Sequence, residues 1–253
     1  MTTAAEHYDQ LLAEHYTWML GGDVRTAATG QAELLRTLGV RPSGTSAAGS
    51  LAIDLGCGSG AQTLALSELG YAQVIAVDSS PRLLEEVREY ARGDAAVRTV
   101  LGDLREALPE VAGPGTAEAV VCMGDTLPHL PRRSDVPALL RDIVQALRPG
   151  GHLVVTYRDL TAELRGTGRF LPVRSTDDQL LTCFLEYRDE DTVTVHDLVH
   201  TRTGDAWELR VGSYPKLRLA AAWFAGECRA AGLEVRHDEV GPRGMRVVHA
   251  VKP

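Results

Sequence analysis

Short apolar runs alternate with segments of helical periodicity through the middle of the chain. A short apolar run between turn residues is typical of a buried strand, whereas apolar residues at every third or fourth position are typical of an amphipathic helix. The runs predict strands over residues 51–55, 73–77, 97–101, 119–123 and 153–157. Because helix-patterned segments separate these strands, the pattern predicts an α/β fold with a doubly wound, mostly parallel sheet.

Two of the intervening helices have clear boundaries. Ser80 supplies an N-cap and Pro81 a first-turn proline ahead of an apolar stripe, which predicts the start of a helix. A second stripe runs over residues 136–147 and is closed by the Pro-Gly-Gly of residues 149–151. We predict both as crossover helices between parallel strands.

The N-terminal part of the chain follows a different pattern. Apolar side chains recur at helical spacing in the first 20 residues, which predicts one amphipathic helix ending at Gly21 and Gly22. A second helix is predicted over residues 31–38. Residues 39–50 are small, polar and rich in helix breakers, so they are interpreted as a linker.

The pattern changes again after Tyr157. Residues 180–188, 192–201 and 206–211 are rich in β-branched and aromatic side chains and are separated by polar turns, which predicts an antiparallel meander. The last predicted elements are a helix over 217–231 and strands over 233–238 and 246–251.

Composition narrows the range of functions. The chain has 253 residues and is 44% hydrophobic, so it can bury one sizeable core with an added subdomain. Lys plus Arg number 26 against 34 for Asp plus Glu, for a formal charge of −8, and no basic run interrupts the chain. Proteins that bind long nucleic acids usually carry a basic footprint, so we expect a small-molecule partner and no nucleic acid. A homo-oligomer is left open.

Cysteine usage and hydropathy bear on the compartment. The four cysteines are scattered without a C-x-x-C pair, and we interpret them as buried reduced thiols: Cys57, Cys122, Cys183 and Cys228. No apolar run reaches the length of about 18 residues that a membrane span needs, and the N-terminus lacks the apolar stretch of a signal peptide. These features predict a cytoplasmic protein without a membrane partner.

The stretch LAIDLGCGSGAQ, residues 51–62, places three glycines directly after the first predicted strand. In a doubly wound sheet, ligands bind beyond the carboxyl ends of the strands, and the first strand-to-helix turn is where the backbone approaches a ligand closely. Gly56, Gly58 and Gly60 allow positive φ there, and the free N–H groups of the next helix offer hydrogen bonds. This turn predicts a nucleotide-like ligand, although glycine turns also serve plain packing.

Acidic residues follow three successive strands. Asp54 precedes the glycines, Asp78 could accept hydrogen bonds from both ribose hydroxyls, and Asp103 could accept from an adenine amino group. Each acid alone is better interpreted as solvated in a loop or as capping the next helix. As a set at successive strand ends, they favour a ligand site.

With these motifs in place, residues from about 51 to 157 resemble the class I S-adenosylmethionine-dependent methyltransferases. The resemblance is carried by D-L-G-C-G-S-G with Asp54, V-D with Asp78, G-D-L with Asp103, and L-R-P-G-G before the fifth predicted strand. A dinucleotide-binding Rossmann domain is the rival, because Gly56 and Gly58 also begin G-x-G-x-x-G, with Ala61 in its last place. The family fold implies seven strands, the last of them antiparallel.

The resemblance implies S-adenosylmethionine as cofactor and assigns residues to it. These are Tyr16, Trp18, Asp54, Gly56, Cys57, Gly58, Gly60, Asp78, Ser79, Asp103, Leu104, Met123, Gly124 and Asp125. For Trp18, plain packing of the N-terminal helix is slightly favoured over cofactor contact.

Within the family, MGDTLPHL followed by LRPGGHLVVTYRDL is most similar to the glycine N-methyltransferase type. That likeness places Gly124, Asp125, Thr126 and His129 in the acceptor loop. It also assigns Arg158 to an acceptor carboxylate. Arg158 leaves the tip of an apolar strand at the ligand end of the sheet, and a guanidinium pairs bidentately with carboxylates; an ion pair with Asp159 or Glu163 is an equal alternative.

Two further features complete the predicted acceptor site. Tyr214 resembles a pocket tyrosine of the same relatives, and Asp125 is acidic where that relative is neutral, which leaves the substrate open. The catalytic assignments are therefore His129, Arg158 and Tyr214.

The predicted organisation follows from these assignments. Residues 1–50 are a helical cap and linker, 51–160 the cofactor-binding core, 161–215 an antiparallel insertion with the acceptor site, and 216–253 the C-terminal helix and last two strands. No catalytic metal is predicted, because His196 and His200 lie on a predicted strand and are about 13 Å apart along it.

The predicted function is methyl transfer to a small molecule by direct in-line displacement, with nitrogen as the favoured acceptor and a carboxylate-bearing acceptor as one option. If the acceptor is a phenol or an activated carbon, His129 or a tyrosine could act as base. The alternatives are O- or C-methylation of a secondary metabolite, a non-catalytic S-adenosylmethionine-binding protein and, more distantly, a nicotinamide oxidoreductase.

Overall fold

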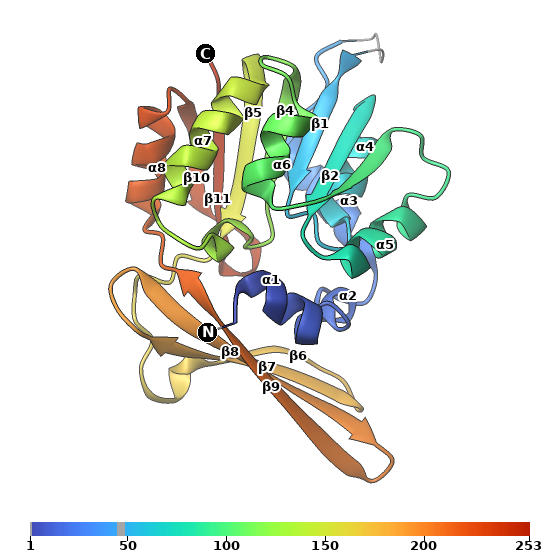
Figure 1. Ribbon diagram of the computed structural model, residues 1–253, viewed down its shortest axis with the longest axis vertical. Coiled ribbons are helices and arrows are strands. Elements are labelled where there is room, and N and C mark those ends of the chain that lie inside the picture. Colours follow the sequence, from blue (N-terminus) through green and yellow to red (C-terminus); the bar gives the residue numbers. More distant parts are fainter. Residues whose placement is uncertain (1, 45–48) are drawn as a thin grey trace.

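Seven strands form the main sheet in the computed structural model, which describes residues 2–44 and 49–253. Their order is β10-β11-β5-β4-β1-β2-β3, and β11 runs antiparallel to both of its neighbours (Figure 1). The strands are β1 Leu51–Leu55, β2 Gln73–Asp78, β3 Val97–Leu101, β4 Ala117–Cys122, β5 Leu147–Tyr157, β10 Glu234–Val240 and β11 Arg246–Val251. The predicted doubly wound, mostly parallel sheet with an antiparallel last strand is confirmed.

Helices cover both faces of the main sheet. They are α3 Val24–Thr37, α4 Ala61–Glu68, α5 Pro81–Tyr90, α6 Leu104–Val111, α7 Asp135–Ala146 and α8 Ala221–Ala230. On one face, α6, α7 and α8 pack on side chains such as Ile53 and Val120, whereas α3 and α4 pack on the other around Ala52 and Val121. Because helices enclose the sheet, every residue of β1 and β4 is buried, which is why each of these strands is apolar in the sequence except at one acidic residue.

Two predicted boundaries near the fifth strand and the last helix were wrong. The L-R-P-G-G segment belongs to β5 and does not precede it, because Leu147 already pairs with Ala117 and the Gly150 N–H donates to the Lys252 carbonyl at 2.7 Å. Helix α8 begins four residues later than predicted because Leu217 is still paired with Thr192 in the second sheet.

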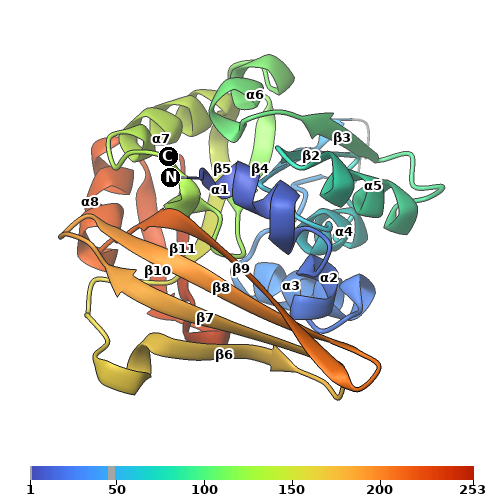
Figure 2. The same cartoon turned by 60° about the horizontal axis from the view of Figure 1, so that its bottom comes forward.

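A second, antiparallel sheet lies between β5 and α8 in the sequence. It comprises β6 Phe170–Ser175, β7 Gln179–Tyr187, β8 Thr192–Thr203 and β9 Ala206–Leu217, in that spatial order (Figure 2). The predicted meander is confirmed, and β6 is an additional edge strand that the sequence pattern missed. His196 and His200 lie on β8, as predicted for a strand.

The N-terminal segment, residues 4–19, is not the single helix that was predicted. It consists of α1 Ala4–His7, the π-helical turn η1 Tyr8–Leu12 and α2 Tyr16–Met19. The helix is interrupted at residues 13–15, where Glu14 pairs with Arg210 and Gln179 contacts the His15 ring at 2.6 Å, so both contacts tie the interruption to the second sheet.

The next helix also differs from its prediction. Helix α3 begins at Val24, earlier than the expected residue 31, because the Asp23 side chain caps it by accepting the Arg25 N–H at 3.0 Å. Part of the predicted linker, residues 45–48, lies outside the described residues. Within residues 2–44 and 49–253, no helix is both long enough and apolar enough to cross a membrane.

The N-terminal segment lies between the two sheets, below the carboxyl ends of the main-sheet strands (Figure 1). Its deepest contact joins Nε2 of His7 to the Asp197 carboxylate at 2.8 Å, and both side chains are buried. Gly212, the β9 partner of Asp197, leaves room for the His7 ring. The second sheet therefore has a binding surface whose shape and polar contact match the N-terminal segment.

We expect Gly212→Ala to lower the free energy of unfolding by about 1–3 kcal/mol, the usual cost of overpacking. A Cβ there would lie 2.6 Å from Nδ1 of His7, so the ring or the strand must shift. The matched control is Gly30→Ala in α3, where a Cβ has no neighbour within 4 Å and should stabilise the helix by up to about 1 kcal/mol. Urea unfolding followed by circular dichroism measures both, and equal effects of the two substitutions would contradict the packing of His7 on β9.

Candidate ligand site at the carboxyl edge of the main sheet

The glycine turn after β1 is held against the end of β2 and the loop after β4. The N–H groups of Gly56 and Cys57 donate to the Val77 carbonyl at 2.8 and 3.0 Å. Gly56 has φ of 71°, and the Thr126 side chain occupies the space that a Cβ at Gly56 would need. Any side chain at Gly56 would therefore be strained and would separate the two loops.

Asp78, at the end of β2, faces this turn. Its Oδ2 accepts the Gly58 N–H at 2.8 Å and its Oδ1 accepts the Ser80 N–H at 2.9 Å. Burial raises the pKa of Asp78, while these N–H groups act in the opposite direction. The structure thus brings Asp78 and Gly58 together, as the strand-end argument predicted.

Asp54 lies below the turn, inside the core. It is 1% exposed, its Oδ2 accepts the Thr63 hydroxyl at 2.7 Å, and its Oδ1 has no hydrogen-bond partner among the described residues. Burial raises the pKa of Asp54 to about 7, despite the opposing hydrogen bond from Thr63. The residue joins β1 to the first turns of α4 beneath the glycines.

Tyr16 fills the space directly beside the glycine turn. A Cβ at Gly58 would lie 2.6 Å from Cε1 and 2.8 Å from the hydroxyl oxygen of the Tyr16 ring, and Gly124 faces the same hydroxyl. Burial raises the Tyr16 pKa, with Asp78 contributing next. A ligand that approaches the backbone at Gly58 must therefore displace this ring.

Asp103 reaches the same edge of the sheet but has other partners. It caps α6 by accepting the Arg105 N–H at 2.9 Å, and its carboxylate pairs with the Arg105 guanidinium at 2.6 Å. The Gly102 N–H donates to the Asp78 carbonyl at 3.0 Å, which joins the ends of β2 and β3. The Arg105 hydrogen bonds lower the pKa of Asp103.

The loop after β4 is fixed by Thr156 of β5. The Thr156 hydroxyl oxygen accepts the Gly124 N–H at 2.8 Å, and the Thr156 carbonyl accepts the Asp125 N–H at 3.0 Å. Gly124 and Asp125 have φ of 73° and 77°, and for Asp125 this left-handed conformation is unusual. Asp125 Oδ1 accepts the Arg158 N–H at 2.8 Å, and its Oδ2 forms an ion pair with Lys216.

His129 lies in an aromatic cluster between the two sheets. Its ring centroid is 5.6 Å from that of Tyr8 and 5.3 Å from that of Tyr214, and Tyr8 is 5.9 Å from Tyr16. His129 Nε2 is buried without a hydrogen-bond partner among the described residues. Burial, followed by the nearby charges of Lys216 and His7, holds the pKa of His129 well below its usual range. A neutral imidazole with a free nitrogen can accept a hydrogen bond or a proton.

Arg158 turns toward the loop between β10 and β11. Its Nη1 donates to the Arg243 carbonyl at 2.9 Å, its Nε lies 3.9 Å from Asp125, and 43% of its side chain is exposed. Neither of the alternative partners takes it, because Asp159 accepts from Thr161 and Ala221, whereas Glu163 pairs with Arg218. Arg158 lies at the rim of the cluster.

Several of the predicted cofactor residues lie apart from this cluster. Trp18 packs with Leu11 and Leu181 and has the Arg174 guanidinium over its ring, in keeping with the packing interpretation. The side chains of Cys57 and Met123 are buried in the core, Leu104 packs against the core, and Ser79 is exposed.

Sequence reasoning missed three residues of the site. The sequence motifs assign no site role to Lys216, His7 or Tyr8. One signal for Lys216 was available, because Lys216 and Lys252 are the chain's two lysines among 26 basic residues.

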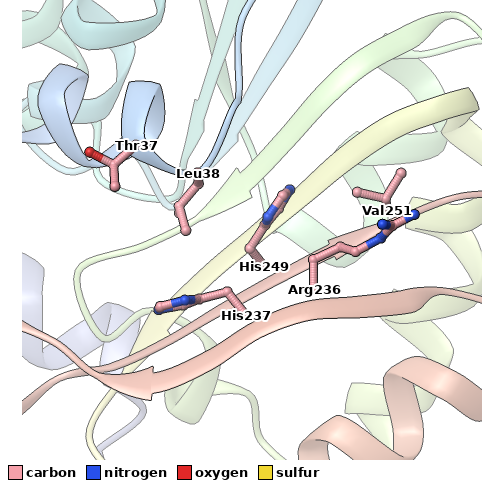
Figure 3. Close-up of a pocket in the computed structure, with 6 residues that line it drawn as sticks. All are labelled: Thr37, Leu38, Arg236, His237, His249 and Val251. Atoms are coloured by element: carbon pink, nitrogen blue, oxygen red, sulfur yellow. The ribbon is translucent and has the colours of Figure 1, made fainter.

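A separate cavity of about 390 Å³ lies on the main sheet away from this edge (Figure 3). It is lined by Thr37, Leu38, Arg236, His237, His249 and Val251. Val251, at the end of the antiparallel β11, pairs with His152 in the middle of β5, so the cavity lies away from the carboxyl end of β5 and from the glycine turn. Across the described parts of the chain, no three His, Cys, Asp or Glu side chains are grouped so as to hold a metal ion.

Comparison with known proteins finds a family model that matches part of the chain and solved structures with a similar fold. Residues 52–151 match the family model described as a methyltransferase domain. The structure is similar to that of a SAM-bound amino pentose methyltransferase from Micromonospora echinaspora, with a TM-score of 0.74, 19% identity and coverage of 96% of this chain and 97% of that one.

Two curated relatives match over the same region. A cypemycin N-terminal methyltransferase from a Streptomyces species is 37% identical over 47% of this chain and 46% of its own length. A ubiquinone biosynthesis O-methyltransferase from Xanthomonas campestris is 35% identical over 45% of each chain. The chain spans about half the length of the curated relatives it matches.

Proposed function

We propose that the chain transfers a methyl group from S-adenosylmethionine to a small-molecule acceptor, because residues 52–151 belong to the methyltransferase-domain family and the chain has the fold of the class I S-adenosylmethionine-dependent methyltransferases. The observation that carries the proposal is the meeting of the Gly58 turn and the Asp78 carboxylate with the His129 cluster at one edge of the main sheet. The Gly58 turn and Asp78 suit a nucleoside, and the His129 cluster lies where an acceptor can approach that nucleoside.

The residues around the glycine turn fit the adenosyl group. Asp78 presents two carboxylate oxygens that can accept ribose hydroxyls, and Gly58 has no side chain, so the Tyr16 ring lies against its backbone. Asp103, at the end of β3, is in reach of the same edge. In this proposal Tyr16 swings away from Gly58 and packs on the bound cofactor.

The sulfonium of S-adenosylmethionine supplies an activated methyl group, so the protein needs no nucleophile of its own. What the chain must provide is alignment and exclusion of water. Tyr8 and Tyr214 pack against His129, and Tyr16 packs against Tyr8, so in this proposal these rings shield the reacting groups from water. In this proposal the second sheet forms the acceptor side of the site.

Nitrogen is the proposed acceptor atom. A neutral amine carries N–H groups, and Nε2 of His129, which has no hydrogen-bond partner among the described residues, is placed to accept a hydrogen bond from one of them. Relatives named as an N-terminal methyltransferase and an amino pentose methyltransferase support an amine, and the second supports a polar ring that bears it.

Oxygen is the second candidate, because one relative is named an O-methyltransferase. A hydroxyl acceptor would need His129 or a tyrosine as base, whereas a neutral amine attacks without one. Product analysis separates the two, since an N-methyl and an O-methyl group differ in carbon chemical shift.

The test of the proposal is calorimetric titration with S-adenosylhomocysteine, followed by incubation with methyl-labelled S-adenosylmethionine and a pool of amine-bearing metabolites. We expect saturable binding and one labelled product. Binding without any product would favour a non-catalytic binding protein, and a response to NADH without one to S-adenosylhomocysteine would favour an oxidoreductase.

For a carboxylate-bearing acceptor, we expect Arg158→Ala to raise the acceptor KM about tenfold and to leave the Kd of S-adenosylhomocysteine within about twofold, because a charge-assisted hydrogen bond contributes about 1.5–3 kcal/mol. Steady-state kinetics and calorimetry measure the two effects. Arg243→Ala is the matched control, because it removes a neighbouring guanidinium and keeps the carbonyl that Arg158 contacts. Equal weakening of cofactor and acceptor would reject this role for Arg158.

A further inference from the structure

Lys216 places a buried positive charge in the acceptor part of the site. Its side chain is 7% exposed and pairs with Asp125, which is 14% exposed. Lys216 is on β9 of the second sheet and Asp125 in the loop after β4, so the pair joins two regions that are far apart in sequence. A buried charge is costly unless it is paired, which makes the contact between these two side chains strongly preferred.

The choice of lysine at this position is unusual for the chain. Almost all of its 26 basic residues are arginine, yet both lysines make enclosed contacts: Lys216 with Asp125, and Lys252 with the carbonyls of Val144 and Leu147. An ammonium is a compact point charge, whereas a guanidinium is a broad planar fork. Replacement of Lys216 by arginine therefore keeps the positive charge beside Asp125 and changes its shape.

Asp125 connects Lys216 to the loop after β4. Its backbone is left-handed, and the same carboxylate accepts the Arg158 N–H at 2.8 Å from the end of β5. Four residues further on, the loop presents His129 to Tyr8 and Tyr214. The position of the imidazole therefore depends on a carboxylate that Lys216 holds.

We propose that Lys216 is a positioning residue for the transfer reaction: through Asp125 it fixes the loop that carries His129, and its charge keeps that imidazole neutral, so that its free nitrogen can accept a hydrogen bond from the acceptor. This inference rests on the proposed function. The acceptor nitrogen holds one surplus proton after it has gained a methyl group; the Nε2 lone pair of His129 accepts a hydrogen bond from that N–H, and the proton then passes to water.

The charges around His129 support the inference. Lys216 and Tyr214 face it from β9, His7 and Tyr8 face it from the N-terminal segment, and Asp125 of its own loop is already paired. Lys216 and His7 both lower the pKa of His129, after the larger effect of burial. Loss of the Lys216 charge would raise that pKa and leave Asp125 with Arg158, whose Nε is 3.9 Å away, as its remaining cation.

The experiment compares the pH dependence of kcat/KM in four proteins: wild type, Lys216→Met, Lys216→Arg, and Lys216→Met combined with Asp125→Asn. The acceptor amine gives an acid limb at its own pKa, which titration of the free amine measures. Catalysis that needs neutral His129 adds a second acid limb, which marks the pKa of His129. We expect Lys216→Met to move this limb about one pH unit upward, and Lys216→Arg to keep it within about 0.3 units of the wild-type position. In the double variant, we expect the limb to return most of the way to the wild-type position. His129→Gln should abolish the limb.

A purely structural role for Lys216 would lower kcat/KM of Lys216→Met by the same factor at every pH, and this outcome would overturn the inference. Unchanged binding of S-adenosylhomocysteine by Lys216→Met shows that the cofactor region is intact, while lack of methyl transfer by the wild type would instead reject the proposed function. If Lys216→Met does not fold, Lys216→Gln against Lys216→Arg supplies the same comparison of a neutral with a charged side chain.

Discussion

Asp78→Ala is expected to weaken the binding of S-adenosylhomocysteine about 100-fold. The substitution removes a carboxylate that can accept two ribose hydroxyls, and hydrogen bonds to a charged group contribute about 1.5–3 kcal/mol each. It also releases the Gly58 N–H, so the glycine turn loses its contact with the end of β2. Isothermal titration calorimetry at constant salt measures the change in Kd.

The control for this substitution must separate ligand binding from local capping, because Asp78 also accepts the N–H of Ser80, two residues along the chain. Asp23 makes the same local contact with Arg25 at the start of α3 but lies outside the cluster. Asp23→Ala should therefore leave Kd within about twofold. Asp103→Ala should have a smaller effect than Asp78→Ala, because Arg105 holds its carboxylate. A Kd for Asp78→Ala equal to that for Asp23→Ala would remove Asp78 from the cofactor site.

The main sheet could be predicted from the sequence because its strands are buried on both faces. A run such as Leu51–Leu55 is apolar at nearly every position for that reason, and its boundaries follow directly. The edge strand β6, Phe170–Ser175, was missed since it is largely exposed and contains a proline, so neither burial nor alternation marks it. The break in the N-terminal helix depends on contacts that Glu14 and His15 make with the second sheet. The local pattern of apolar residues does not reveal such long-range contacts.

The residues of the site also divide into those that the sequence predicts and those that it does not. The glycine turn and Asp78 come from consecutive βα units, so their meeting at one edge follows from topology alone. Lys216 and His7 reach the site from β9 and α1, and only the docking of the second sheet and the N-terminal segment brings them near His129. The orientation of Arg158 toward Arg243 depends on the β10–β11 loop, which local sequence reasoning had no means to place.

Asp54→Asn is expected to stabilise the protein at pH 8 by as much as about 4 kcal/mol relative to its effect at pH 4. The pKa of Asp54 is about 7 in the folded chain, against an ordinary value of 3.8. Below pH 4 the carboxyl is protonated in both states and contributes nothing. Between pH 4 and 7 the unfolded chain releases the proton while the folded chain keeps it, so stability falls as pH rises; above pH 7 the full penalty of the buried charge remains. Asparagine is neutral at every pH and does not incur this penalty.

The measurement is the difference in the free energy of unfolding between Asp54→Asn and wild type, taken from urea titrations at intervals from pH 4 to 8.5, because the difference cancels the titration of all other groups. Asp205→Asn, in the exposed turn between β8 and β9, should give a difference that is flat with pH. Thr63→Val tests the cause, since it removes the hydroxyl donated to the carboxylate at 2.7 Å, raises the pKa of Asp54 further, and should extend the fall in stability to pH values above 7. A flat difference for Asp54→Asn would mean that the Asp54 carboxyl titrates as it does in water, and that the space beneath the glycine turn is hydrated and not part of the closed core.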